Sequence, residues 1–158
     1  MRKFLYCYIF AILVVAAHSQ VFAAQPAVQL DFNQTLSPEE LNRRAIQYQI
    51  EISSKVADQL RLIFTDFNNS FIDYEPALKK MHLLTYEYER AMKEMPVAIP
   101  PDGQKLHQLT LSLLSKIEQY FVFYKMAGMG NPDVNIQITR VLYDITAERE
   151  MLIQKYLL

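Results

Sequence analysis

Histidine and methionine are the residues of this sequence that could ligate a haem iron. A haem bound between helices would need an axial methionine and histidine on facing helices. His82 and His107 are available for this role, together with several methionines: Met81, Met92, Met95, Met126 and Met151. Covalent attachment is not expected, because Cys7 is the only cysteine and no Cys-x-x-Cys-His motif exists. Methionine at a helix interface is normally core filler, so we expect no bound haem.

The same histidines are poorly placed for a metal site. A di-iron bundle needs a Glu-x-x-His pair on each of two helices. Lys79 and Gln104 stand where those glutamates would precede His82 and His107. Zinc needs three or four histidine, cysteine or acidic ligands, and two histidines on separate helices do not supply them. We therefore expect no metal and no cofactor.

The acidic and glycine-containing segments do not indicate an active site. Glu87 with Glu89, and Glu148 with Glu150, are two residues apart and do not share a helix face. We expect these acids on solvated surfaces. The Gly-Met-Gly segment 128–130 lacks the preceding strand and the following Lys-Ser/Thr of a phosphate-binding loop. The histidines are not accompanied by a serine-containing catalytic motif. The sequence therefore predicts a protein that is not an enzyme.

The beginning of the chain resembles a secretory signal peptide in its order of residues. Residues 1–3 carry two positive charges, residues 4–17 are uncharged and largely apolar, and small residues stand before Ala24. We predict a signal peptide over residues 1–23, cleaved after Ala23 or after Ala24. The apolar run is shorter than the roughly 20 residues of a membrane span, so no stable membrane insertion is expected after cleavage.

The cysteine content and the net charge limit the cellular compartment and the classes of partner that the protein is expected to have. Cys7 lies inside the predicted signal peptide and away from its cleavage point, so neither a lipid anchor nor a disulfide is expected. This composition favours a bacterial protein that is periplasmic or secreted. Removing residues 1–23 leaves 14 basic against 17 acidic residues, a net charge of −3, with no basic run longer than two. Neither nucleic acid nor an anionic membrane surface is an expected partner.

Apolar residues recur every three or four positions after residue 37, which is the period of an amphipathic helix. We predict a flexible leader over 24–36 and an all-α domain over 37–158, folded as an antiparallel up-down-up-down four-helix bundle. The four helices are expected at about 38–72, 76–95, 104–127 and 132–157.

Polar residues and prolines mark where these helices begin and end. Ser37 is expected to cap the first helix, and Glu40 to complete a capping box. Asp102 and Asn131 are expected to cap the third and fourth helices. Gly128 is expected to end the third helix.

The predicted first helix is too long for its neighbours. At about 1.5 Å per residue, residues 38–72 would span roughly 52 Å, against about 30 Å for residues 76–95. Either the helix breaks near Asn68-Asn69-Ser70, or one end projects beyond the bundle. A projecting end would offer an apolar contact surface, whose candidate residues are Leu41, Ile46, Tyr48 and Ile50.

Two further features of the sequence leave alternatives open. Residues 120–124 are aromatic or β-branched all around the helix. This segment is either buried on several faces, or it exposes Phe121 and Phe123 as a second contact surface. Arg149 falls in the apolar line of the last helix. It either pairs with a buried carboxylate or extends its charged end to the surface.

These observations predict a non-enzymatic, exported helical binding protein of the bacterial cell envelope, such as an adaptor, a chaperone-like factor or a secretion accessory. Its expected partner is another protein or a second copy of itself. Two alternatives remain: a bundle that carries haem, metal or a small apolar molecule, and a secreted effector.

Overall fold

The computed structural model describes residues 36–95 and 97–158. The predicted signal peptide and the predicted leader up to residue 35 lie outside the described residues. The described residues form four α-helices and no strand: α2 (Pro38–Asn68), α3 (Tyr74–Glu94), α4 (Pro101–Ala127) and α5 (Pro132–Tyr156). The prediction of an all-α, four-helix domain is confirmed.

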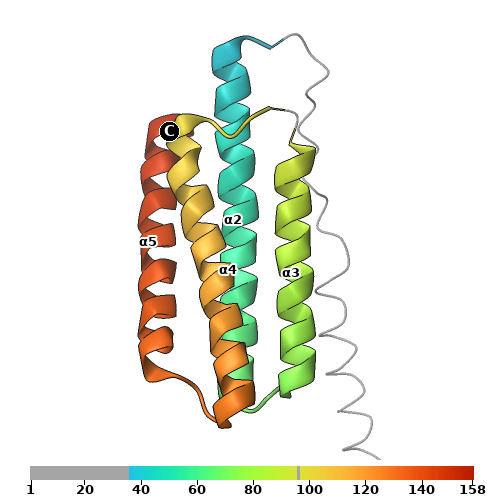
Figure 1. Ribbon diagram of the computed structural model, residues 1–158. Helices are drawn as coiled ribbons and strands as arrows, with labels where there is room; N and C mark the ends of the chain where they lie inside the picture. The colour runs from blue at the N-terminus through green and yellow to red at the C-terminus, as the bar shows by residue number, and fades with distance from the viewer. Residues whose placement is uncertain (1–35, 96) are drawn as a thin grey trace, which may run out of the picture. The chain divides into compact units, whose positions relative to one another are not determined.

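The helices lie side by side, with α2 and α4 in the middle and α3 and α5 on opposite flanks (Figure 1). The loops 69–73 and 128–131 are at the lower end of Figure 1, and the 97–100 segment is at the upper end. Because α2 and α4 contact each other and both flanking helices, each buries more than one face. α3 packs mainly against α2 and much less against α4, whereas α5 packs extensively against both central helices.

The first helix is shorter than predicted, and both explanations of its length hold in part. α2 ends at Asn68, is followed by Asn69, and is terminated by Ser70 in the left-handed region at φ 58°. The predicted break near Asn68-Asn69-Ser70 is therefore confirmed. The first turns of α2 also extend beyond the other helices at the upper end (Figure 1).

Local capping rules predicted some helix ends and failed at others. At the start of α2, Ser37 Oγ accepts from the Glu40 amide at 3.2 Å, as expected. The Glu40 carboxylate does not close a capping box, because it binds Arg43 and Arg44, which lower the pKa of Glu40 to about 2. The expected Asn131 cap of α5 is present, with Oδ1 accepting from two backbone amides.

The start of α4 also differs from the prediction. α4 begins at Pro101, three residues earlier than expected, with Pro100 in the N-cap position. Asp102 therefore does not cap the helix. Its carboxylate accepts from Lys155 Nζ at 2.7 Å and from the Tyr156 hydroxyl, so it joins the start of α4 to the end of α5. Gly128 ends α4 at φ 70°, as predicted.

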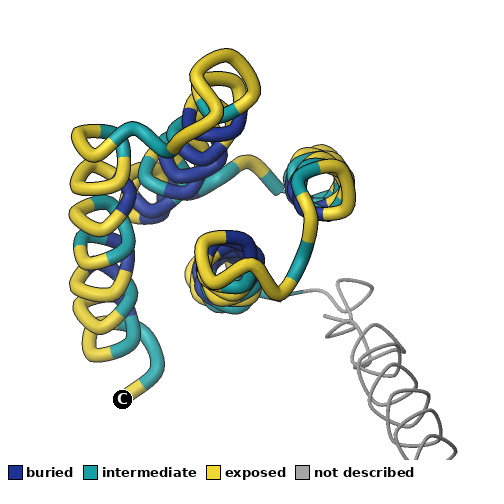
Figure 2. The backbone as a smooth tube through the Cα atoms, turned by 90° about the horizontal axis from the view of Figure 1, so that it is seen from below, coloured by how far each residue is buried: buried dark blue, intermediate teal, exposed yellow. Residues whose placement is uncertain are grey.

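The core runs between the facing sides of the helices (Figure 2). Its lower end is aromatic. Phe67 lies against Phe121 and Tyr124, with ring centroids 5.0 and 4.7 Å apart, and Phe64 lies 4.7 Å from Tyr120. The Tyr120 hydroxyl donates to Asn68 Oδ1 at 2.6 Å. Such ring pairs stabilise a fold beyond the effect of their buried area. The lower end is therefore closely packed, and the buried Tyr120 hydroxyl has a hydrogen-bond partner.

Candidate functional site

A group of uncharged polar side chains interrupts the apolar core in the upper half of the bundle. We call it the polar cluster: Gln49 and Ser53 on α2, Tyr88 on α3, and His107 and Thr110 on α4. All except His107 are at most 1% exposed, and His107 is half-buried. Residues 49 and 53 are one turn apart, as are 107 and 110, so each pair faces the same side of its helix. Tyr88, near the end of α3, meets His107, near the start of α4.

The Tyr88–His107 pair joins α3 to α4 within this cluster. The Tyr88 hydroxyl lies 2.7 Å from His107 Nδ1, and the two rings stack with centroids 5.7 Å apart. Burial lowers the pKa of His107. Burial raises the pKa of Tyr88, and this outweighs the lowering caused by hydrogen bonding of its hydroxyl with the side chains of Ser53, Thr110 and Gln49. Both groups are therefore neutral at pH 7, and the tautomer of the imidazole decides whether the phenol or Nδ1 donates.

Within the described part of the chain, three polar atoms of the cluster have no hydrogen-bond partner of ordinary geometry: Gln49 Oε1, Gln49 Nε2 and Ser53 Oγ. The Thr110 hydroxyl, in contrast, is paired, because it donates to the Leu106 carbonyl at 2.9 Å. A buried polar group left unpaired costs about 1–3 kcal/mol, which is a large fraction of the stability of a domain. The cluster therefore lowers the stability of the fold, and the packing of the core alone does not explain why polar residues stand there.

Gly103 lies beside the Gln49 amide, in the first turn of α4. It is buried, and a Cβ added there would lie 3.0 Å from Gln49 Oε1 and 3.3 Å from Ile99 Cγ2. The glycine thus lets the backbone of α4 approach the amide closely. Ile99, in the segment that leads into α4, closes this side of the cluster.

A second polar arrangement holds α5 to the central helices. Glu148 was expected on a solvated surface, but it is only 4% exposed and pairs with Lys105 Nζ of α4 at 2.5 Å. Its position between α4 and α5 explains the difference. Arg149 faces α2 instead, where Nη1 donates to Ser54 Oγ at 3.5 Å, and its buried Nε has no partner among the described residues. Of the two alternatives for Arg149, the pairing with a buried carboxylate is therefore not the one observed.

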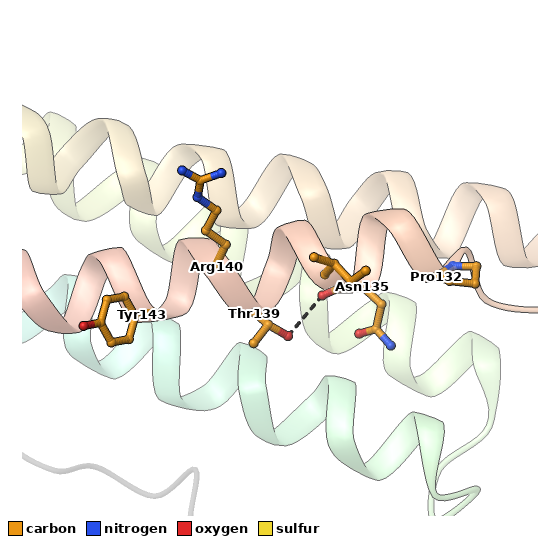
Figure 3. Close-up of a pocket in the computed structure, with 6 residues that line it drawn as sticks. Pro132, Asn135, Thr139, Arg140 and Tyr143 are labelled. Atoms are coloured by element: carbon orange, nitrogen blue, oxygen red, sulfur yellow. Dashed lines mark hydrogen bonds between the residues drawn. The ribbon is translucent and has the colours of Figure 1, made fainter.

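The outer face of α5 carries an open groove along one side of the helix (Figure 3). Ile136 and Tyr143 are 68% and 74% exposed, although both side chains are large and apolar in most of their surface. They are two turns apart and so lie on one face of the helix. The groove is lined by Pro132, Asn135, Ile136, Thr139, Arg140 and Tyr143.

The contact residues predicted from the sequence fall into two groups. Ile46, Ile50 and Phe121 are at most 5% exposed, so the prediction that they form a contact surface is wrong. Ile46 and Ile50 belong to the hydrophobic core, because α2 buries a second face that carries them. Phe121 packs against Phe67.

The other predicted contact residues keep some accessible surface. Leu41 and Tyr48 are half-buried, and Phe123 is exposed. Their role in a contact stays a prediction. Residues 120–124 are buried on one side of α4 and exposed on the other, since Tyr120 and Phe121 are in the core while Val122 is 52% exposed.

Neither the polar cluster nor the outer face of α5 was found from the sequence. Gln49 and Ser53 each follow an apolar residue of the predicted core line, Tyr48 and Ile52. Polar residues in that position are typical of the solvent-facing side of an amphipathic helix. The signal for their burial was a second apolar line through Ile46, Ile50 and Ala57. That line shows that α2 buries two faces.

Comparison with known proteins gives no relative for this arrangement. No protein-family model matches the chain, and neither a curated protein nor a solved structure matches it significantly. Within residues 36–95 and 97–158, no three histidine, cysteine or acidic side chains come together as metal ligands. None of the described helices is both long and apolar enough to cross a membrane.

Proposed function

We propose that this chain is an exported, non-enzymatic binding protein of the bacterial cell envelope, built as an antiparallel up-down-up-down bundle, whose partner is another protein. The observation that carries the proposal is the outer face of α5. Ile136 and Tyr143 present large apolar side chains there, and Arg140 lies between them on the helix. Exposed aromatic and arginine side chains are the residue types that most often dominate protein interfaces.

The helices behind this face support a role in binding. α5 is held on its inner side by the Glu148–Lys105 pair and by Ile138, Ile145 and Leu152 in the core. Its outer side is thus a preformed, straight surface, and binding to it requires little ordering of the chain.

Site-specific photo-crosslinking in living cells tests the contact. A benzophenone amino acid replaces Tyr143, and in a matched control it replaces Tyr86, an exposed tyrosine on α3. We expect a discrete crosslinked protein from position 143, which is lost when Ile136→Glu is added and is absent at position 86. Identical products from both positions, or none from position 143, would contradict the proposal.

Export is tested on the same cells. The protein should be released with the periplasmic contents or found in the medium, and N-terminal sequencing should begin at Ala24 or Gln25. A chain that retains Met1 in the cytoplasmic fraction would refute export without bearing on the contact surface.

A second candidate function, a bundle that carries a small molecule between its helices, is favoured by the polar cluster. Its unpaired polar groups lie one turn apart on a buried side of α2. An absorption spectrum and a metal analysis of the purified protein test the haem and metal forms of this alternative.

A further inference from the structure

The polar cluster contains more hydrogen-bonding groups than its own residues satisfy. A glutamine side chain offers two N–H donors and an acceptor oxygen, and a serine hydroxyl offers a donor and two acceptor positions. Among the described residues, neither side chain makes a hydrogen bond of ordinary geometry, although both lie close enough to the Tyr88 hydroxyl to lower its pKa. The unused groups come from two successive turns of α2, and they lie in the layer that Tyr88 and Thr110 close from α3 and α4.

A buried serine in a helix can donate its hydroxyl hydrogen to a backbone carbonyl one turn earlier. Ser54, the residue after Ser53, donates to the carbonyl of Ile50 one turn earlier, at 2.6 Å. Thr85 and Thr110 do the same on α3 and α4. Ser53 does not, so its hydroxyl is not paired with the backbone of its own helix.

The chemistry of the cluster defines what it would bind. No charged side chain takes part in the hydrogen bonds of its five residues, among those the structure describes. A charged molecule would therefore lose its hydration without gaining a counter-charge. A neutral molecule with both a donor and an acceptor matches the amide of Gln49 and the hydroxyl of Ser53.

The walls of the cluster limit the size of such a molecule. Gly103 and Ile99 close the side next to Gln49. Tyr88, fixed by His107, closes the side of α3. The most direct route inward lies between α3 and α4, because these neighbouring helices pack against each other least.

We propose that the polar cluster is an internal binding site for a small neutral molecule that donates and accepts hydrogen bonds. Gln49 and Ser53 are its direct ligands, and the oxygens of Tyr88 and Thr110 are further acceptors. Water and a small primary amide share this chemistry. This proposal rests on the second candidate function, a bundle that carries a small molecule. The site is separate from the outer face of α5, so its failure leaves the proposed protein contact intact.

Oxygen-17 relaxation dispersion of the solvent, measured with the full chain as cells produce it, counts long-lived internal water molecules. We expect Gln49→Leu to remove the contribution of about one or two such molecules, and Ser53→Ala to reduce it. The matched control is Ser54→Ala, because the Ser54 hydroxyl already donates to the Ile50 carbonyl and accepts from Arg149. This control should leave the dispersion unchanged.

Acetamide is the probe for the second possible occupant, a small primary amide. It is titrated into the nitrogen-15-labelled protein while the side-chain NH₂ signals of Gln49 are followed. A shift at Gln49 that is abolished by Ser53→Ala, with loss of the water contribution, supports a site that takes small amides. A water contribution that acetamide does not displace supports a hydration site.

The proposal is overturned if the dispersion is the same in the wild type, Ser53→Ala and Gln49→Leu, and acetamide shifts no Gln49 signal. It is also overturned if Ser54→Ala lowers the dispersion as much as Ser53→Ala does. Ser53→Ala removes one oxygen atom only, so it keeps the test valid if Gln49→Leu does not fold.

Discussion

The Tyr88–His107 hydrogen bond is the clearest contact between α3 and α4, and replacing Tyr88 with phenylalanine removes it. The substitution keeps the ring, which is buried and stacks on His107, and removes only the hydroxyl. A typical intramolecular hydrogen bond contributes about 0.5–1.5 kcal/mol net, and a buried partner left unpaired adds to the loss. His107 is half-buried, so water can partly replace the phenol at Nδ1. We therefore expect Tyr88→Phe to lower the free energy of unfolding by about 1–2 kcal/mol.

Urea unfolding of the full chain at pH 7, followed by circular dichroism, measures this change as a lower midpoint with an unaltered slope. Tyr86→Phe on the same helix is the control. Tyr86 is exposed, its recorded contact is the face of its ring with the Arg90 guanidinium, and phenylalanine preserves that ring. The control should stay within about 0.5 kcal/mol of the wild type. If both variants unfold at the same urea concentration, the Tyr88–His107 bond does not stabilise the bundle and the reasoning is wrong.

Three further predictions concern stability. Because burial lowers the pKa of His107 in the folded state, the unfolded chain binds more protons below about pH 6.5. Wild-type stability should therefore fall from pH 7 to pH 5, and more steeply than that of His107→Gln; equal slopes in urea titrations would contradict this. Lys105→Met should destabilise the fold by leaving the Glu148 carboxylate unpaired, and adding Glu148→Leu should restore the midpoint; no recovery in the double variant would count against the pair. Gly130→Ala should lower the thermal midpoint, because its Cβ would overlap the Tyr120 hydroxyl; an unchanged midpoint would show that the ring moves freely.

Helix ends could be predicted from the sequence where a local rule had no competitor. Among the described residues, no charged group draws Asn131 or Gly128 away from capping, and both behave as predicted. Asp102 and Glu40 carry full charges near cations, so they bind lysine and arginine side chains instead of backbone amides. Whether such a cation lies within reach depends on tertiary structure, as for Lys155, which is 53 residues away from Asp102.

Burial could be predicted only where a helix buries a single face. One apolar line describes α3 well, whose buried residues are Ala77, Met81, Leu84 and Tyr88. α2 is central and buries two faces. A single apolar line therefore assigned Ile46 and Ile50 to an exposed surface, whereas both are buried. The polar cluster was missed for the same reason, because polar residues on a second buried face resemble a solvated side.

The two ends of the bundle are built from different chemistry, and this difference bears on where the chain opens. At the lower end, the aromatic rings of α2, α3 and α4 are closely packed, and the Tyr120 hydroxyl has a partner in Asn68. At the upper end, α3 meets α4 through one hydrogen bond beside unpaired polar groups. Local opening is easiest where few apolar contacts are lost, so α3 should separate from α4 at the upper end first. That movement exposes Gln49 and Ser53 while the aromatic end keeps the bundle folded. The costly polar groups thus lie where the fold can admit a small molecule without unfolding.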